Sequence, residues 1–130
     1  MPQHPLLIVE DDALIAMYLE EVLNGSDYRV VGVAESAEDA LRLADAHRPA
    51  LALVDVSLKG PVQGDAVVRS LRDRHGVVSV LTTGHADGEV RSALSECGAA
   101  ALIVKPYTRE QLLAVLVQAA AGVGRPGRPA

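Results

Sequence analysis

The stretch that decides the fold is Leu6-Leu7-Ile8-Val9, which is followed at once by Glu10-Asp11-Asp12. A continuous apolar run closed by acids is typical of a strand that is buried on both faces of a parallel sheet. The pattern returns in four further segments, at 30–34, 50–54, 77–81 and 100–104. Each is short, aliphatic or β-branched, and bounded by polar or glycine-containing residues. The sequence therefore predicts five buried strands.

Helical patterns alternate with these strands. Six apolar residues of the first pattern recur at helical spacing and are predicted to share one buried face: Leu14, Ile15, Tyr18, Leu19, Val22 and Leu23. Similar patterns around 40–44, 67–71 and 90–94 predict three more helices, and a last helix is predicted over 108–121. Asp12 is placed to cap the first helix, and Thr108 with Gln111 matches a capping box for the last one.

The alternation predicts a (βα)₅ domain of the α/β class, with a doubly wound, flavodoxin-like parallel sheet. With strand order 2-1-3-4-5, the first and third strands are neighbours, and ligands bind at the carboxyl ends of the strands. The domain is expected to span residues 1–121. Residues 122–130 contain three Gly, two Pro and two Arg, and are expected to form a flexible tail.

Composition narrows the classes of function. The 130 residues carry a net charge of -5, which argues against a nucleic-acid partner, because such binding needs clustered Lys and Arg. The longest apolar runs are too short to span a bilayer and no signal peptide is present, so a cytoplasmic protein without a membrane partner is expected. The single Cys97 excludes an internal disulfide and is expected to pack in the core.

The chemistry is expected at the strand ends. Glu10 and Asp11 follow the first strand and Asp55 follows the third, so their three carboxylates should converge on one rim. Such a cluster is unfavourable without a hard cation, and Mg²⁺ suits its oxygen ligands. Thr83 and Lys105, after the fourth and fifth strands, could bind two oxygens of a phosphoryl group carried by Asp55. Asp55 would then be the nucleophile.

Each of these residues also has an ordinary structural explanation. Asp12 is better explained as a helix cap than as a ligand, and Asp55 alone would more often be a solvated turn residue. Lys105 alone would more often be a surface charge. Their joint occurrence, in order after the first, third, fourth and fifth strands, is what favours a site.

The motif set resembles that of the receiver domains of response regulators in two-component signalling. The resemblance covers residues 5–121 and rests on four motifs: Val9-Glu10-Asp11-Asp12, Asp55, Thr83-Gly84 and Lys105-Pro106-Tyr107. It implies that Asp55 is the phosphoacceptor and that Thr83 and Lys105 hold phosphoryl oxygens. It also implies Mg²⁺ bound directly by Asp11, usually through water by Glu10, and by the backbone carbonyl of Ser57. The Lys105-Pro106 peptide bond is expected to be cis.

The resemblance also implies partners. A histidine kinase or phosphotransfer protein would donate the phosphoryl group, and the receiver would catalyse only its own phosphorylation and dephosphorylation. The face formed by the fourth helix, fifth strand and fifth helix would bind a downstream target or a second copy. Because the chain ends soon after the fifth helix, a single-domain regulator is expected, although a receiver cut from a longer protein would look the same.

Three features depart from the family pattern. Leu102 stands three residues before the lysine, where a switching Tyr or Phe is usual, and Tyr107 is expected to pack rather than to replace that aromatic. The loop 57–64 is one residue longer than the commonest form. His85 either tunes hydrolysis of the acyl phosphate or is an exposed polar residue, and the sequence favours neither.

Two other functions remain open. An aspartyl-nucleophile phosphatase also uses Asp, Thr or Ser, Lys and Mg²⁺, but such enzymes generally place the nucleophile first in a DxD motif, whereas Asp55 is followed by Val56-Ser57 and the metal acids lie upstream. A phosphorylation-independent interaction or dimerisation module would keep the fold without using the chemistry. The intact set of acids, Thr83 and Lys105 argues against that degeneration.

Overall fold

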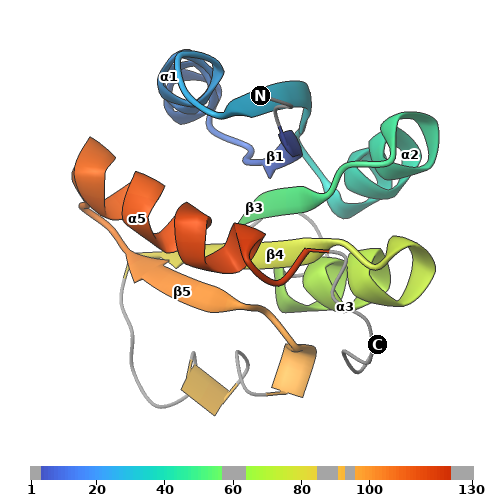
Figure 1. The fold of residues 1–130 in the computed structure, drawn as a ribbon. Coiled ribbons are helices and arrows are strands. Elements are labelled where there is room, and N and C mark those ends of the chain that lie inside the picture. Colours follow the sequence, from blue (N-terminus) through green and yellow to red (C-terminus); the bar gives the residue numbers. More distant parts are fainter. Residues whose placement is uncertain (1–3, 57–63, 85–90, 93–95, 124–130) are drawn as a thin grey trace.

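A computed structural model describes residues 4–56, 64–84, 91–92 and 96–123. Five strands form one parallel sheet in the order β2-β1-β3-β4-β5 (Figure 1). Their bounds are β1 (His4–Val9), β2 (Tyr28–Ala34), β3 (Leu51–Asp55), β4 (Val78–Thr83) and β5 (Ala101–Val104). The predicted flavodoxin-like sheet and its strand order are therefore confirmed. The strands differ from the predicted segments by up to two residues at either end, so that Asp55 and Thr83 are the last residues of their strands rather than residues beyond them.

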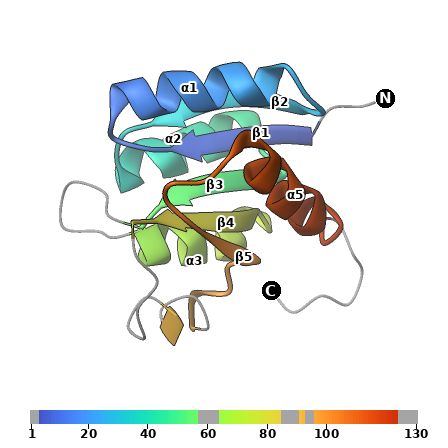
Figure 2. The same ribbon diagram turned by 90° about the vertical axis from the view of Figure 1, so that its left-hand side faces the viewer.

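Helices cover both faces of the sheet, as the views in Figures 1 and 2 show. Their bounds are α1 (Ala13–Asn24), α2 (Ala37–His47), α3 (Gly64–His75) and α5 (Arg109–Ala120). Helices α2 and α3 pack on one face, and α1 and α5 on the other. The predicted fourth helix falls largely on 85–90 and 93–95, outside the described residues.

Two apolar clusters, one on each face of the sheet, form the core. In β1, Leu7 and Val9 belong to the cluster under α2 and α3, while Leu6 and Ile8 belong to the one under α1 and α5. Side chains alternate between the two faces of a strand, and helices cover both faces of this sheet. All four residues from Leu6 to Val9 are therefore buried, which explains why all four are apolar. Cys97 is fully buried in the first cluster, as predicted.

The predicted helix caps are present. The Asp12 carboxylate accepts hydrogen bonds from the backbone N–H groups of Leu14 and Ile15, at 3.0 and 3.2 Å. At α5, the Gln111 N–H donates to the Thr108 hydroxyl while the Thr108 N–H donates to the Gln111 side chain, which completes the capping box. Asp12 thus uses its carboxylate to begin α1, as predicted.

The predicted buried face of α1 is partly wrong. Leu14 and Tyr18 are 77% and 48% exposed. Their neighbour Met17 is also exposed, at 64%. The residues of α1 that the sheet buries are Ala16, Leu19 and Leu23. The apolar residues of this helix span a wider arc than the sheet covers. An apolar stripe is left on the surface.

The chain beyond α5 is described only as far as Val123. The Val123 side chain is half-buried against the cluster under α1 and α5. Residues 124–130 lie outside the described part. Among the described residues, no helix is long and apolar enough to cross a membrane.

Candidate functional site

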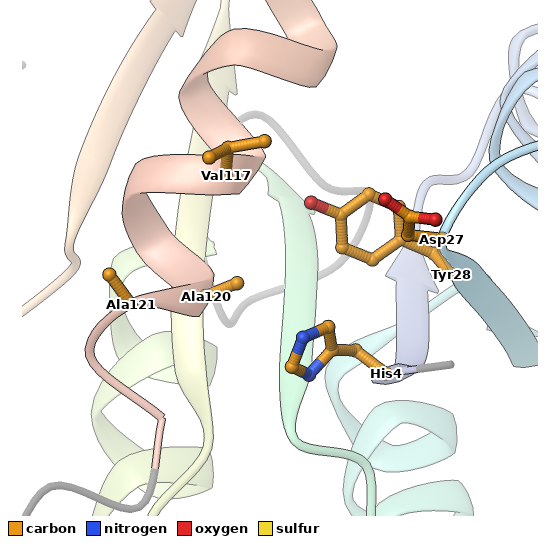
Figure 3. Close-up of a pocket in the computed structure, with 6 residues that line it drawn as sticks. All are labelled: His4, Asp27, Tyr28, Val117, Ala120 and Ala121. Carbon is orange, nitrogen blue, oxygen red and sulfur yellow. The ribbon is translucent and has the colours of Figure 1, made fainter. Parts of the chain in front are cut away.

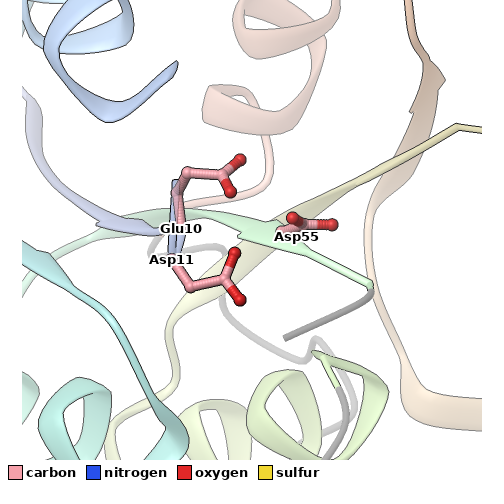
Figure 4. A group of neighbouring side chains, drawn as sticks. All are labelled: Glu10, Asp11 and Asp55. Atoms are coloured by element: carbon pink, nitrogen blue, oxygen red, sulfur yellow. The ribbon is translucent and has the colours of Figure 1, made fainter. Parts of the chain in front are cut away.

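The strand ends of β1 and β3 bring three acids together. Val9 pairs with Val54 in the sheet, so Glu10 and Asp55 stand level at the carboxyl ends of adjacent strands. Glu10, Asp11 and Asp55 each offer a carboxylate oxygen, and these atoms lie within 4.8 Å of one another (Figure 4). The convergence that was predicted from the strand pattern is therefore present.

Two of the three acids are buried. Glu10 is 3% exposed and Asp55 is 8% exposed, whereas Asp11 is half-buried. The backbone holds Glu10 in place, because its N–H donates to the Ala34 carbonyl at 2.9 Å. Its side chain accepts a hydrogen bond from the Asp12 N–H at 3.2 Å. The cluster is thus rigidly built and largely withdrawn from water.

The pKa of Glu10 reflects its burial and its charged neighbours. Burial raises the pKa of Glu10 from 4.5 to about 7. The hydrogen bond from the Asp12 N–H lowers that pKa, the Asp55 carboxylate raises it, and Lys105 lowers it. Because the factors that favour the protonated form prevail, Glu10 binds a proton more readily than an exposed glutamate does.

Lys105 closes the site from the β5 side. Its backbone N–H donates to the Thr83 carbonyl at 2.7 Å, which ties the end of β5 to the end of β4. Its Nζ lies 3.7 Å from Glu10 Oε1 and 3.6 Å from Asp55 Oδ2. These distances are too long for hydrogen bonds, so the ammonium is shared between two acids and held tightly by neither. The Lys105-Pro106 peptide bond is cis, as expected.

Thr83 completes the rim. Asp55 pairs with Thr82 across β3 and β4, so Thr83 stands one residue beyond the phosphoacceptor candidate on the neighbouring strand. Thr83 also pairs with Val104, the residue before Lys105. It is only 3% exposed. The predicted Thr83 and Lys105 therefore flank the acids on the side away from β1.

A close backbone approach at Gly64 was not foreseen from the sequence. Helix α3 begins at Gly64, and its N–H donates to the Val56 carbonyl at 3.1 Å. A Cβ at this position would overlap the backbone carbonyl oxygen of Asp55. Only glycine lets the start of α3 press on the strand end that carries Asp55. The one available signal was the glycine that closes the loop before a helical pattern.

Tyr107 packs against the core and also interacts electrostatically with the acids. It is half-buried against the cluster under α1 and α5, in keeping with packing. Burial raises the pKa of Tyr107 to about 12, with further contributions from Glu10, Tyr18 and Asp55. Its hydroxyl is therefore within electrostatic reach of both the acid cluster and α1.

The remaining predicted residues fall in two groups. Leu102 is half-buried on β5, pairs with Leu81 of β4, and packs against the cluster under α2 and α3. Ser57 and His85 lie outside the described residues, as does the loop before Gly64. Their predicted roles as carbonyl ligand and hydrolysis modulator stay predictions.

The donor set suits a hard divalent cation. All three converging groups are carboxylates, which are the ligands that Mg²⁺ prefers, and burial together with the neighbouring Asp55 carboxylate raises the pKa of Glu10. A cation here would remove the repulsion among buried acids that otherwise destabilises the rim.

Comparison with known proteins identifies this arrangement. Residues 6–117 match the family model described as the response regulator receiver domain. The chain is 35% identical over 108 residues to the transcriptional regulatory protein PdtaR of Mycobacterium tuberculosis, covering 83% of this chain and 52% of that protein. It is 33% identical over 115 residues to the phyllosphere-induced regulator PhyR of Methylorubrum extorquens, covering 88% and 42%. The chain thus spans about half the length of these curated relatives.

Solved structures agree. The signal receiver domain of the putative response regulator NarL from Mycobacterium tuberculosis superposes with a TM-score of 0.86 at 25% identity, covering 94% of this chain and 99% of that one. The receiver domain of a modulated diguanylate cyclase from Desulfovibrio desulfuricans gives a TM-score of 0.84 at 28% identity, covering 92% and 94%.

Proposed function

The chain belongs to the response regulator receiver family of two-component signalling, and we propose that it accepts a phosphoryl group on Asp55 in a Mg²⁺-dependent reaction. The observation that carries the proposal is the convergence of Glu10, Asp11 and Asp55 on one rim with Lys105 between two of them. Asp55 is the acid that sits at the end of the central strand. Glu10, Asp11 and Lys105 lie around it.

Each residue of the rim has a distinct part in the proposal. Mg²⁺ would be held by Asp11 and Asp55, by Glu10 through water, and by the Ser57 carbonyl, and when bound it offsets charge on the phosphoryl oxygens. An Asp55 carboxylate oxygen forms a bond to phosphorus as the bond from phosphorus to the donor breaks, and the bonding electrons leave with the donor. Lys105 and Thr83 bind two of the phosphoryl oxygens.

The rest of the proposal concerns partners and location. We take the phosphodonor to be a histidine kinase or phosphotransfer protein in the cytoplasm, in keeping with the family. The output would be read at the β5 and α5 side, where Lys105 and Thr83 meet through the backbone. Because position 102 is Leu, the signal cannot reach this side through the rotation of a Tyr or Phe that is usual at that position in the family.

The test is direct phosphorylation of the purified chain. Incubation with Mg²⁺ and a small phosphodonor such as acetyl phosphate should give one alkali-labile phosphoryl adduct by intact mass. The adduct should be absent from Asp55→Asn and after chelation of Mg²⁺, and strongly reduced in Asp11→Asn. The matched control is Asp12→Asn, because Asn caps helices as well as Asp does and this residue lies outside the proposed ligand set.

Three outcomes would contradict the proposal. An adduct that persists on Asp55→Asn would show that the phosphoacceptor is another residue. A chain that takes no phosphoryl group under these conditions, yet binds a partner equally well with and without Asp55→Ala, would support a phosphorylation-independent interaction module instead. Multiple turnovers of a phosphomonoester would favour the phosphatase alternative.

A further inference from the structure

A hollow of about 310 Å³ opens at the amino end of the sheet, at the opposite end of β1 from the acid cluster (Figure 3). One of its walls is the apolar end of α5, and the other carries three polar side chains. Its volume is at the small end of the range for ligand pockets, so it suits a small group rather than a large cofactor. The lining residues are Val117, Ala120 and Ala121 on the first wall, and His4, Asp27 and Tyr28 on the second.

The Tyr28 hydroxyl faces this hollow without a hydrogen-bond partner. The residue is 4% exposed, and its ring packs in the cluster under α1 and α5. Its hydroxyl points toward α5 across the hollow, as Figure 3 shows. Nothing in the described part of the chain donates a hydrogen bond to this hydroxyl or accepts one from it. Buried phenols usually have such a partner, so the hydroxyl is placed to bind a ligand.

The fixed charge at the hollow comes from Asp27. This residue is exposed, and it forms no ion pair with any other described residue. Burial raises the pKa of Tyr28 and the Asp27 carboxylate raises it further, so this carboxylate acts electrostatically on the phenol. Among the described residues, no lysine or arginine lines the hollow. The hollow therefore favours a cation over an anion.

The helix ends nearby add to this preference. Helix α5 ends at the hollow, and α1 ends at Asn24, shortly before Asp27. Neither helix has a basic residue in its last turn, whereas the last turn of α3 holds Arg72, Arg74 and His75. Because the C-terminal end of a helix carries partial negative charge, a cation in the hollow would stabilise the end of α5.

We propose that this hollow binds a guanidinium group on a short aliphatic chain. The Asp27 carboxylate would accept hydrogen bonds from the guanidinium, and the Tyr28 hydroxyl would accept another. The rings of His4 and Tyr28 stand 6.0 Å apart and are tilted by 33°, and a planar cation stacks favourably on aromatic rings. The aliphatic chain would lie on Val117 and Ala120. The inference does not depend on the proposed phosphorylation.

The guanidinium group has two possible sources. One is a free small molecule of the guanidine class. The other is the chain itself, since Arg125 and Arg128 follow α5 in the sequence. Both sources would present the same chemistry to Asp27 and Tyr28, so one probe serves to test the site and variants of the two arginines distinguish the sources.

The first experiment titrates the whole chain with n-butylguanidinium at constant ionic strength. The methyl resonances of Val117, Ala120 and Ala121 should shift and saturate, with a dissociation constant on the order of 1 mM for so small a ligand. The control ligand is n-butyrate, which has a similar aliphatic chain and the opposite charge, and it should cause no saturable shift. Saturable shifts with butyrate, or none with butylguanidinium up to about 20 mM, would overturn the proposal.

The second experiment repeats the titration on single variants. Asp27→Asn should weaken binding at least about fivefold and Tyr28→Phe about threefold, because each removes one partner of the guanidinium. Glu35→Gln is the matched control, since it removes an exposed carboxylate just beyond the other end of β2. It should change the affinity by less than about twofold. Equal losses in Asp27→Asn and Glu35→Gln would show that only the overall charge matters, and would overturn the proposal.

The third experiment identifies the source with the double variant Arg125→Gln/Arg128→Gln. Tighter probe binding by this variant than by the unchanged chain would show that the chain's own arginines compete for the hollow. Equal affinity would assign the hollow to a free guanidine, and either result supports the site. A chain that binds the probe but takes no phosphoryl group would overturn the proposed function alone. A phosphorylated chain whose Asp27→Asn variant binds the probe as tightly as wild type would overturn only this inference.

Discussion

The two ends of β1 meet the same sheet but differ in chemistry. At the carboxyl end, Glu10 is buried beside the ionisable side chains of Asp55 and Lys105. At the amino end, the rings of His4 and Tyr28 stand 6.0 Å apart beside the open hollow of Figure 3. Tyr28 is as buried as Glu10, at 4% exposed against 3%.

Equal burial has unequal consequences at these two ends. Burial raises the pKa of Tyr28, with a smaller contribution from Asp27, and this keeps its hydroxyl neutral at any physiological pH. Burial raises the pKa of Glu10 to about 7, which places its ionisation in the physiological range. The amino end therefore gains apolar packing at little electrostatic cost, whereas the carboxyl end buries a carboxylate at a cost in stability, at the site where we propose that a cation and a phosphoryl group bind.

The largest expected effect is the pH dependence of stability without Mg²⁺. The pKa of Glu10 is 4.5 in the unfolded chain and about 7 in the folded one, so its contribution is fully present below pH 4.5 and is lost as pH rises through 7. The loss should be roughly 3 kcal/mol of unfolding free energy. Urea titrations from pH 4.5 to 8 measure it.

Glu10→Gln is the variant that sharpens this prediction. It should flatten the pH profile in that range, and Tyr28→Phe at the other end of β1 should leave the profile unchanged. Saturating Mg²⁺ should restore stability at the upper end of the range, because the ionised cluster of the folded state is the proposed Mg²⁺ site. Equal pH profiles for wild type and Glu10→Gln would contradict the assignment to Glu10.

A smaller effect is expected from a methyl group at Gly64. Its Cβ would overlap the Asp55 carbonyl oxygen, so Gly64→Ala should cost about 2 kcal/mol and slow phosphorylation by displacing the end of β3. Gly25→Ala, at the amino end of the sheet, is the control. Its Cβ would meet only ordinary contacts, 3.5 Å from the Glu21 carbonyl oxygen. Chemical denaturation and initial phosphorylation rates distinguish the two, and equal losses in both variants would refute the close approach.

The smallest effect is expected at Tyr28. Its hydroxyl points toward α5 beside the open hollow in Figure 3, so Tyr28→Phe should change the unfolding free energy by less than about 0.5 kcal/mol. Phosphorylation should be unaffected. Thermal unfolding at pH 7 measures the change, and a loss above about 1 kcal/mol would mean that the hydroxyl makes a structural hydrogen bond.

Much of the site followed from patterns that are local in the chain. Five apolar runs predicted the strands, and the acids, Thr83 and Lys105 at their ends predicted the rim. The caps of Asp12 and Thr108 also follow from local chemistry, because the side chain and its backbone partners are at most three residues apart. The expectation of a cis bond at Pro106 came from the family resemblance and was confirmed.

Other features depend on distances between parts of the chain that sequence spacing does not measure. The apolar arc of α1 was visible, but which side of it the sheet would cover was not, and Leu14 and Tyr18 proved to be exposed. The contact between Gly64 and Asp55 joins the start of α3 to the end of β3. Neither could be inferred from one element alone.

The amino-acid sequence by itself determined the alternation of strands and helices, the strand ends that carry the chemistry, and the helix caps. These depend on hydrophobic periodicity and on hydrogen bonds between near neighbours. Only the tertiary structure decided the raised pKa of Glu10, the sharing of Lys105 between two acids and the apolar surface left on α1 and α5. Those follow from packing, because burial and distance are set by elements that are far apart in the chain.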